Sequence, residues 1–535
     1  MKLSDLIKAL KPLCVVRKGA PQSTDPEIKS VHYRAQNVEP GGLFVAIAGH
    51  AADGHDFIEA AIKKGAVAVV SQKDLGSETL NIRVTNARQA LADIAASFYG
   101  RPSERLTVVG ITGTNGKTTT AYLVESILQQ AGCIVGVIGT INYRYAGKSF
   151  DNPITTPESL DLQRILADML RAGVTHVVLE ASSHAIDLYR IRRCWFDVAV
   201  FINLSQDHLD FHGNMESYWA SKERLFSEYL ITGPKKDQAV AVINCNSSKG
   251  KELADNLQVP AIRVGSGPGD VIRAVSVQCD LSGIAGEIET PGGKFDFKSQ
   301  LVGEHNLENI LCATGVGLGL NLSIDDLKSG IDAVASIPGR LERIENNSGR
   351  FVYVDYAHTP DALENVIRAL RAVAADRIIC VFGCGGDRDS DKRPLMGEIA
   401  ARLCDLAVIT SDNPRTEEPG AIINQILEGT RKINCRRYAP IDLQSGFNEK
   451  GYVVEADRQR AIQLGVSVSQ TGDTVLIAGK GHETYQILGT STIAFDDRDE
   501  ARKALAELAA GWQQNSKCEP AISNDSHKAD TLDSE

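Results

Sequence analysis

The chain has 535 residues, of which 43 % are hydrophobic, and its formal net charge is −11. This length exceeds one ordinary hydrophobic core and predicts roughly two to four domains, while the acidic balance argues against nucleic acid as a main partner, because phosphate binding needs a basic surface. The 11 cysteines are scattered and lack paired CxxC spacing, so we expect neither a disulfide framework nor a zinc site. We therefore expect the protein in the reducing cytoplasm.

Residues 1–100 are expected to form a small α/β domain. The opening stretch "MKLSDLIKALKPL" predicts a short amphipathic helix rather than a secretory signal, because charged residues interrupt its apolar run. Two strand-like runs, 43–49 and 66–71, flank an amphipathic helix that Gly65 closes. No run in the sequence is long and apolar enough to span a bilayer, so we expect no membrane insertion.

A second α/β unit is expected over residues 101–337. A strand at 106–112, a Gly-rich turn, a helix at 118–132 and a strand at 134–140 have the spacing of a βαβ unit in a parallel sheet. Further strands are predicted at 176–181, 196–204 and 238–245.

A third α/β unit is expected over residues 338–514, after a joint in the sequence "SIPGRLERI". Its strands are predicted at 350–357, 377–384, 406–412 and 473–479. Residues 515–535 are polar and lack periodicity, which predicts a disordered tail.

The Gly-rich turn of the predicted unit 101–337 reads "GITGTNGKTTT" (110–120). Glycines let the backbone approach a phosphate, Lys117 can reach the terminal phosphates, and Thr118 offers a hydroxyl to Mg²⁺. Ile111 stands where the usual eight-residue loop has glycine, so this is a shorter GxxGKT variant. A Gly-rich connection without a ligand is the alternative, but the strand before it and the helix after it favour nucleotide binding. A kinase, a switch GTPase, a motor and a ligase all remain open.

Polar side chains follow two further strands of the second unit. Glu180 ends one strand, where it is either a Mg²⁺ ligand or the cap of the next helix. After the next strand, "QDHLDFHG" carries Asp207, His208, Asp210 and His212. A lone histidine is more often structural than a ligand, but this density of metal-capable side chains favours a site.

The third unit carries a polar cluster after each of its predicted strands. These clusters lie at 354–363, 383–394, 410–420 and 478–486. A solvated loop explains any one of them. Because ligands of open parallel sheets bind at the carboxyl ends of the strands, four such clusters predict one shared site.

Seven motifs occur in an order that resembles the Mur ligase family over roughly residues 25–505: "GTNGKTTT", "TTPES", "SSHA", "QDHLDFHG", "GCGGDRD…KRPLM", "DNPRTEEP" and "GKGHE". The resemblance implies an α/β fold with three domains. These are a small α/β UDP-binding domain (1–100), a central P-loop ATPase domain with a mainly parallel sheet (101–337) and a Rossmann-like C-terminal domain that binds the amino acid (338–514).

The motifs look like those of family members that add meso-2,6-diaminopimelate to UDP-N-acetylmuramoyl-L-alanyl-D-glutamate in peptidoglycan precursor synthesis. The implied reaction is ATP-dependent and needs Mg²⁺. The substrate's carboxylate attacks the γ-phosphate of ATP, and the amine of the amino acid then attacks the acyl phosphate. Catalysis of this kind is mostly positioning and charge neutralisation. The expected partners are ATP, UDP-MurNAc-dipeptide and diaminopimelate, and a monomer is expected.

The resemblance also implies site residues. Catalytic roles fall to Lys117, Glu180, His208 and Lys222. ATP-binding positions are Gly113, Thr114, Asn115, Gly116, Lys117, Thr118, Thr119, Asn309, Arg340 and Asp355. UDP-substrate positions are His50, Ala51, Ala52, Thr155, Thr156, Ser182 and Arg190. Amino-acid positions are Arg388, Asp412, Asn413, Pro414, Arg415, Gly479 and Glu483, and metal ligands are Thr118, Glu180, His208 and Lys222.

Two stretches bear on specificity. "DNPR" favours diaminopimelate over L-lysine, because Arg415 can clamp the second carboxylate, which lysine lacks, with two parallel hydrogen bonds. Near the N-terminus, Ala35 and Gln36 replace a Ser-Arg pair that many family members carry before "LFVA", so Ala35 is expected to offer at most a backbone contact to the uridine end.

Lys222 interrupts an apolar helical stripe in "MESYWASKERLF" (215–226). A lysine on a core-facing stripe either extends its ammonium to water or has a special role. Its position matches the family's lysine that CO₂ carbamylates, giving N6-carboxylysine, an anionic ligand for Mg²⁺.

Two other classes of function remain to be weighed. One is a different ligase of the superfamily, such as a folylpolyglutamate synthetase, which "TTPES", "DNPR" and "GKGHE" argue against. The other is a P-loop NTPase switch, which leaves the polar clusters of the third unit without a role.

Overall fold

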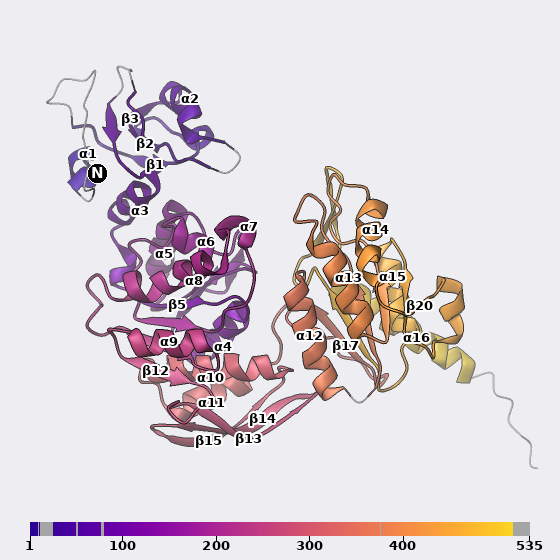
Figure 1. Ribbon diagram of the computed structural model, residues 1–535. Helices are drawn as coiled ribbons and strands as arrows, with labels where there is room; N and C mark the ends of the chain where they lie inside the picture. Colours follow the sequence, from indigo (N-terminus) through magenta and orange to yellow (C-terminus); the bar gives the residue numbers. More distant parts are fainter. Residues whose placement is uncertain (9, 11–24, 50–51, 76–79, 375, 517–535) are drawn as a thin grey trace, which may run out of the picture. The chain divides into compact units, whose positions relative to one another are not determined.

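The computed structural model describes residues 1–8, 10, 25–49, 52–75, 80–374 and 376–516. It divides the chain into two compact units, Met1–Pro338 and Gly339–Glu535 (Figure 1). Over the described residues, no helix combines the length and apolar character needed to cross a bilayer.

The first unit begins with a parallel sheet of order β1-β2-β3-β4. Helix α2 packs on one face of this sheet and α3 on the other, because successive strand residues such as Leu43 and Phe44 point into different cores. The predicted N-terminal helix is present as α1. The elements are α1 (Leu3–Lys8), β1 (Ser30–His32), η1 (Ala35–Asn37), β2 (Gly42–Val45), η2 (Gly54–Phe57), α2 (Ile58–Lys63), β3 (Ala66–Ser71), β4 (Asn81–Arg83) and α3 (Ala87–Phe98).

The same unit continues into an eight-stranded sheet of order β12-β11-β10-β5-β9-β6-β7-β8, which is parallel except at β7 and β8. Its elements are η3 (Pro102–Glu104), β5 (Thr107–Thr112), α4 (Lys117–Gln130), β6 (Val135–Ile138), β7 (Tyr143–Tyr145), β8 (Lys148–Phe150), α5 (Ser159–Arg171), β9 (His176–Glu180), α6 (Ser183–Asp187), β10 (Val198–Phe201), α7 (Leu209–His212), α8 (Met215–Arg224), the π-helical η4 (Leu225–Leu230), β11 (Val240–Asn244), α9 (Ser248–Asn256) and β12 (Ala261–Val264).

A three-stranded antiparallel sheet and two helices complete this unit. They are β13 (Arg273–Asp280), β14 (Gly283–Thr290), β15 (Gly293–Ser299), α10 (Glu304–Gly319) and α11 (Ile324–Asp332). The eight-stranded sheet is covered on both faces: Val109 packs with α4, α10 and α11, whereas its neighbour Val108 packs with α5. Burial on both faces explains why its central strands are continuous apolar runs in the sequence.

The second unit is built on a sheet of order β16-β17-β22-β18-β19-β21-β20, with α12, α13 and α14 on one face and α15 and α16 on the other. Its elements are β16 (Glu342–Arg343), β17 (Phe351–Asp355), α12 (Pro360–Val373), β18 (Ile378–Phe382), α13 (Lys392–Leu403), β19 (Leu406–Ile409), α14 (Pro419–Thr430), β20 (Arg436–Arg437), η5 (Pro440–Ser445), β21 (Gly451–Val454), α15 (Arg458–Ser467), β22 (Thr474–Ala478), β23 (Tyr485–Leu488), β24 (Ser491–Ala494) and α16 (Asp497–Ser516).

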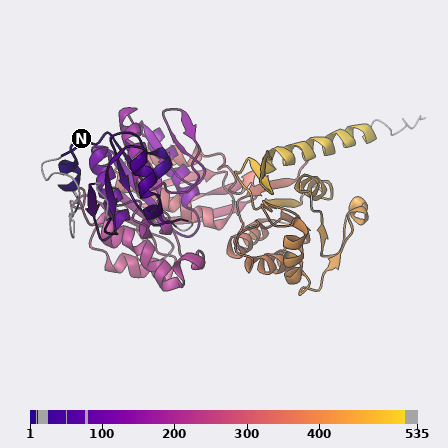
Figure 2. The same ribbon diagram turned by 90° about the horizontal axis from the view of Figure 1, so that it is seen from above.

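Helix α16 packs on α15 and then extends beyond the rest of its unit (Figure 2). It ends at Ser516, so the first two residues of the predicted disordered tail are helical. Residues 517–535 lie outside the described residues.

The topology gathers the loops that carry the motifs. Strands β5, β9 and β10 are parallel neighbours, so the phosphate loop, Glu180 and the stretch 203–213 follow strand ends at one sheet edge. In the second unit, β17, β22, β18 and β19 are consecutive parallel neighbours, which brings the four polar clusters to one edge.

Candidate active site

The phosphate loop of the first unit joins β5 to the start of α4. Gly116 has φ +84°, and a Cβ there would lie 2.3 Å from Asn309 Oδ1, so this turn requires glycine. Asn203 Oδ1 accepts hydrogen bonds from the backbone N–H groups of Thr114 (3.1 Å) and Asn115 (2.9 Å). The loop's shape is therefore fixed by the neighbouring strand end and by α10.

Two lysines converge on one carbonyl of this loop. Lys117 Nζ donates to the carbonyl oxygens of Gly113 (3.0 Å) and Thr114 (2.8 Å). Lys222 Nζ reaches the Gly113 oxygen from α8 (2.8 Å) and lies 4.4 Å from the centroid of the Tyr218 ring. Lys222 is 1 % exposed, and burial, helped by the charge of Lys117, lowers its pKa well below the usual value. The lysine of the apolar stripe therefore points into the phosphate loop rather than to water.

Glu180 is buried beside the start of α4. Its Oε2 accepts from Thr118 Oγ1 (3.1 Å) and Thr140 Oγ1 (2.8 Å), and its Oε1 accepts from the Thr140 N–H (3.1 Å). A Cβ on Gly139 would lie 2.2 Å from Oε1. The cap of the following helix α6 is Ser182, not Glu180, which removes the capping alternative for this carboxylate.

His208 occupies a left-handed backbone position (φ 54°) at the start of α7, and its ring packs edge-on against His184 at 4.7 Å. Burial lowers the pKa of His208, and the neighbouring Asp207 carboxylate opposes that shift. Burial thus favours the neutral imidazole, the form that binds a metal.

Two other metal-capable side chains of "QDHLDFHG" contact polar neighbours. Asp207 lies 3.4 Å from the His208 ring, and His212 Nε2 lies 3.0 Å from Ser183 Oγ. Within the described part of the chain, no three His, Cys, Asp or Glu residues form a group that could hold a metal ion. The density of these residues therefore does not build a metal cage.

The donors near the phosphate loop do fit Mg²⁺. The Thr118 hydroxyl and the Glu180 carboxylate lie 3.1 Å apart at the start of α4. Mg²⁺ prefers oxygen ligands and is usually held by one or two carboxylates together with waters and substrate phosphates rather than by a full protein cage. Thr118 and Glu180 are the residues on which this fit rests, and His208 remains a predicted third ligand.

Residues predicted for the UDP-substrate adjoin this carboxylate. Thr155 Oγ1 lies 3.1 Å from Thr140 Oγ1, and Thr156 Oγ1 donates to the Glu180 carbonyl at 2.6 Å. Arg190 in turn donates to the Thr156 carbonyl (3.2 Å). One hydrogen-bonded chain thus connects the predicted ATP residue Thr118 with the predicted acceptor-substrate residues.

The chain of contacts continues toward the N-terminal sheet through Glu158, which was not among the predicted site residues. Its Oε2 lies 2.8 Å from Arg88 on α3 and 3.6 Å from Arg190. Arg88 also donates to the Ala48 carbonyl in the loop after β2 (2.8 Å).

The predicted N-terminal contacts are only partly described. Ala52 is exposed, whereas His50 and Ala51 lie outside the described residues. Ala35 is buried in a core cluster with Phe44, so its side chain packs rather than binds.

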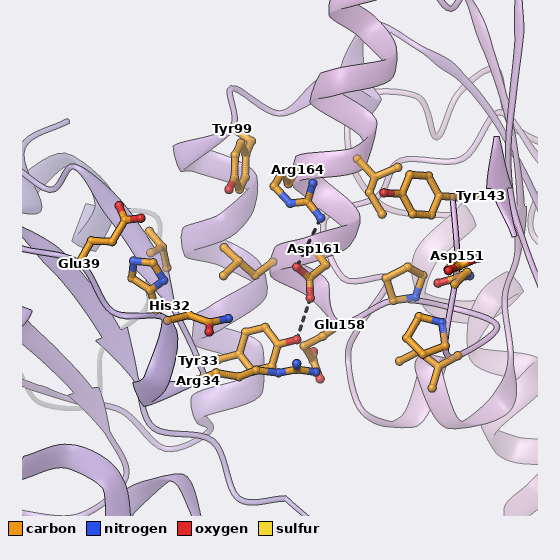
Figure 3. A pocket seen from close by; sticks show the side chains of 18 residues that line it. His32, Tyr33, Arg34, Glu39, Tyr99, Tyr143, Asp151, Glu158, Asp161 and Arg164 are labelled. Carbon is orange, nitrogen blue, oxygen red and sulfur yellow. Dashed lines mark hydrogen bonds and ion pairs between the residues drawn. The ribbon is translucent and has the colours of Figure 1, made fainter. Parts of the chain in front are cut away.

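A pocket of about 500 Å³ opens between β1 and α5 (Figure 3). The Tyr33 hydroxyl donates a hydrogen bond to Asp161 Oδ2 (2.7 Å), and the Arg34 guanidinium lies 5.4 Å from the centroid of the Tyr33 ring. Glu158 lines the same pocket. No motif of the sequence marked Tyr33 or Arg34, because the hydrogen bond joins residues 128 positions apart.

The residues predicted to bind the incoming amino acid, in the unit Gly339–Glu535, come together from two loops. Asp412, Asn413, Pro414 and Arg415 follow β19, and Gly479 and Glu483 follow β22. Gly479 has φ +120°, and a Cβ there would lie 2.5 Å from Asp412 Oδ2. Asn413 Nδ2 donates to Glu483 Oε2 at 2.9 Å.

Arg415 is held in a left-handed conformation (φ 54°) by the hairpin β23–β24. Its N–H donates to the Ile487 carbonyl (3.2 Å), and its carbonyl accepts from the Gly489 N–H (2.7 Å). One guanidinium nitrogen donates to the Gly386 carbonyl (2.7 Å), which places Arg415 against the loop after β18. Arg388 lies exposed on that loop.

Two buried cations of this region were missing from the predicted site. Lys480, in the loop after β22, is 0 % exposed, and its Nζ donates to Asn413 Oδ1 in the loop after β19 (3.0 Å). Arg458 pairs with Asp497 (2.7 Å) and donates to the carbonyls of Ser411 (3.2 Å) and Ala478 (3.0 Å), directly before each loop. The "GKGHE" motif was a signal for Lys480, whereas nothing in the sequence connected Arg458 with Asp497.

Arg340 and Asp355 also belong to the second unit. The Asp355 carboxylate accepts from the N–H groups of Leu341 (2.7 Å) and Ala357 (2.8 Å). Burial raises the pKa of Asp355, and the charge of Arg340 opposes that rise. The Arg340 guanidinium lies 4.8 Å from the centroid of the Tyr356 ring.

Three segments of the chain match known protein families. Residues 27–99 match "Mur ligase family, catalytic domain", residues 111–317 match "Mur ligase middle domain", and residues 339–481 match "Mur ligase, glutamate ligase domain".

Named relatives can be aligned with this chain over nearly its whole length. A protein of Geobacter metallireducens named UDP-N-acetylmuramoyl-L-alanyl-D-glutamate--2,6-diaminopimelate ligase is 47 % identical, over 96 % of this chain and 100 % of its own. A protein of Synechococcus elongatus with the same name is 44 % identical, over 90 % of this chain and 95 % of its own.

Solved structures agree with this likeness. A structure of a ligase of that name has a TM-score of 0.67 and 30 % identity, covering 95 % of this chain and 100 % of that one. A folylpolyglutamate synthase of Mycobacterium tuberculosis, complexed with ADP and AMPPCP, shares the fold at a TM-score of 0.58 and 18 % identity, covering 78 % of this chain and 95 % of that one.

Proposed function

The chain belongs to the Mur ligase family, and from this premise we propose that it is the ATP-dependent ligase that joins meso-2,6-diaminopimelate to UDP-N-acetylmuramoyl-L-alanyl-D-glutamate. The position of Glu180 carries the proposal. Its side-chain carboxylate accepts a hydrogen bond from Thr118 at the phosphate loop, and its backbone carbonyl accepts one from Thr156. A ligase needs its nucleotide and its acceptor side by side, whereas a nucleotide switch does not.

The residues of the first unit support the activation step. The substrate's carboxylate oxygen attacks the γ-phosphorus of ATP and ADP leaves, which gives an acyl phosphate. Lys117, now bonded to the carbonyls of its own loop, supplies positive charge to the phosphates. When Mg²⁺ is bound by Thr118, Glu180 and His208, it neutralises phosphate charge. The amine of the amino acid then attacks the acyl carbon and phosphate leaves.

Lys222 is proposed to act as N6-carboxylysine. A neutral amine attacks the carbon of CO₂ and loses one proton, which leaves an N-bound carboxylate. Burial favours the neutral amine, and Lys222 is fully buried with a strongly lowered pKa. Its Nζ lies 2.8 Å from the Gly113 carbonyl, so the added carboxylate would supply anionic oxygen beside the phosphate loop, the ligand type that Mg²⁺ prefers.

The UDP-substrate is proposed to bind between the N-terminal and the eight-stranded sheets of the first unit. Thr155, Thr156, Ser182 and Arg190 line the side next to Glu180, and the pocket between β1 and α5 lies at the same junction. The pairing of Glu158 with Arg88 and Arg190 holds this junction together.

The amino acid is proposed to bind at the edge of the second unit. Arg415 offers a guanidinium to the distal carboxylate of diaminopimelate, and Asp412 and Glu483 offer carboxylates to its distal ammonium. Lysine carries no carboxylate at this end, so it would leave the charge of Arg415 without its partner.

We further propose that the protein works in the cytoplasm as a monomer, where its product serves cell wall formation and, through it, cell shape and division. The ATP requirement and the nine free cysteines among the described residues support a reducing compartment.

Phosphate release by the purified protein tests this function. We expect phosphate release to require ATP, UDP-MurNAc-dipeptide and an amino acid together. The value of kcat/KM for meso-diaminopimelate should exceed that for L-lysine at least roughly 100-fold, because L-lysine lacks the carboxylate that pairs with Arg415. Release that is independent of the dipeptide favours a nucleotide switch. Equal turnover of the two amino acids contradicts the assignment of Arg415.

A further inference from the structure

Lys480 is a fully buried lysine that the proposed chemistry has not used. It directly follows Gly479 after β22, and its exposed fraction is 0 %. A buried ammonium is unfavourable unless it is paired and hydrogen-bonded. Its partners therefore indicate what it does.

Both polar partners of Lys480 belong to the predicted amino-acid site. Its Nζ donates to Asn413 Oδ1 (3.0 Å) and to Glu483 Oε2 (3.1 Å). Asn413 Nδ2 donates to the same Glu483 oxygen at 2.9 Å. Because both bonds fall on Oε2, they fix the carboxylate's orientation and leave Oε1 to accept from a ligand.

Asn413 is a bridge in this arrangement. Its side-chain oxygen accepts from Lys480 and from the Ile487 N–H (3.0 Å), and its nitrogen donates to Glu483. The amide thus joins the loop after β22 to the hairpin β23–β24. Lys480 lies where the two site loops and the hairpin meet.

We propose that Lys480 is the positioning residue of the amino-acid site, which holds Glu483 ready for the distal ammonium of the incoming amino acid. This inference rests on the proposed function. Charge complementarity supports it, because Lys480 places a cation 3.1 Å from Glu483, one of the two carboxylates proposed for the distal ammonium. Without Lys480 two carboxylates would face the substrate's own carboxylate with one cation fewer.

A purely structural lysine would behave differently. Its loss would affect the whole second unit, so KM for ATP, which Arg340 and Asp355 of that unit are predicted to contact, would change together with KM for the amino acid. A positioning residue that acts through Glu483 predicts a change confined to the amino acid and strong coupling between the two residues.

Steady-state kinetics of Lys480→Met, Glu483→Gln and the double variant test the proposal, with meso-diaminopimelate, ATP and UDP-MurNAc-dipeptide each varied in turn. We expect Lys480→Met to raise KM for diaminopimelate roughly 10- to 100-fold, the worth of a charged hydrogen bond, with the other two KM values unchanged. The double variant should be no worse than the more impaired single variant. Lys480→Gln, which keeps a donor, should recover part of the loss and carries the test if Lys480→Met does not fold.

Lys432→Met is the matched control, since Lys432 makes an exposed pair with Glu398 (3.4 Å) in the same unit; it should leave all three KM values unchanged. Multiplying effects in the double variant, or equal rises in all KM values, overturn the proposal. If the wild-type protein itself shows no diaminopimelate-dependent phosphate release, the proposed function fails; if it does and Lys480→Met leaves KM unchanged, this inference alone fails.

Discussion

At the scale of single residues, Lys222 combines two properties that exclude an ordinary surface lysine. It is 1 % exposed, and its pKa lies well below the usual 10.5 because burial and Lys117 disfavour the ammonium. The neutral amine exists above the lowered pKa, so carbamylation should be lost as the pH falls through that value. We expect Lys222→Ala to lower kcat at least roughly 100-fold, the loss typical of a group that stabilises charge in the transition state, with partial rescue by added formate or acetate.

Nuclear magnetic resonance with ¹³C-labelled CO₂ provides the independent readout. The wild-type protein should show a carbamate signal that Lys222→Ala lacks. Lys249→Ala is the matched control, because Lys249 also lies near an aromatic ring, that of Trp219 at 5.5 Å, but is 41 % exposed. Full activity of Lys222→Ala, or an unchanged carbamate signal, would refute the role of this lysine.

At the scale of elements, helix α4, which follows the phosphate loop, packs very closely against α11. A Cβ on Gly330 would lie 2.4 Å from the Ile127 Cα, and the Gly330 carbonyl accepts from Ser126 Oγ at 2.7 Å. Gly330→Ala should force the helices apart and reduce the free energy of unfolding of the first unit by about 1–3 kcal/mol, the usual effect of overpacking. Urea unfolding followed by hydrogen exchange at α4 measures it.

The control for this substitution is Gly420→Ala on α14. Gly420 lies in a helix with nothing within 4 Å of an added Cβ. This change should be neutral or stabilise by up to about 1 kcal/mol, because alanine is the better helix former. If Gly330→Ala is equally harmless, the close approach of α11 to α4 is not needed for stability.

At the scale of the whole molecule, the N-terminal sheet is joined to the eight-stranded sheet of its unit by ion pairs around one buried carboxylate. Asp93 on α3 is 5 % exposed and pairs with Arg192 (3.0 Å) and Arg193 (2.6 Å). Removing the charge of this buried carboxylate leaves two partly exposed guanidinium groups without their shared partner. Asp93→Asn should therefore loosen the connection between α3 and β5, speed proteolysis there and raise KM for UDP-MurNAc-dipeptide, while KM for diaminopimelate stays unchanged.

Limited proteolysis and kinetics of Glu59→Gln, an exposed position on α2, provide the comparison, since this change removes a charge from the same part of the chain without breaking a buried pair. Proteolysis of Asp93→Asn at the wild-type rate, with an unchanged KM for the dipeptide, would show that these arginines do not hold the junction.

Local patterns predicted much of this molecule. The strand before the phosphate loop and the helix after it were expected at 106–112 and 118–132 and are present as β5 and α4, because continuous apolar runs and Gly-rich turns act over a few residues. The inward direction of Lys222 followed from helical spacing. The sequence could not distinguish a Mg²⁺ ligand from a helix cap at Glu180, whereas the structure assigns the cap to Ser182.

The Mur ligase family, the α/β class and the loops that carry the motifs could be predicted from the sequence, since these depend on residue type at short and fixed spacing. Which side chains meet became clear only from the folded chain. Lys480 with Asn413, Arg458 with Asp497 and Tyr33 with Asp161 lie 67, 39 and 128 positions apart. Such pairs depend on the order of strands in a sheet, which brings distant loops to one edge, and no local pattern encodes that order.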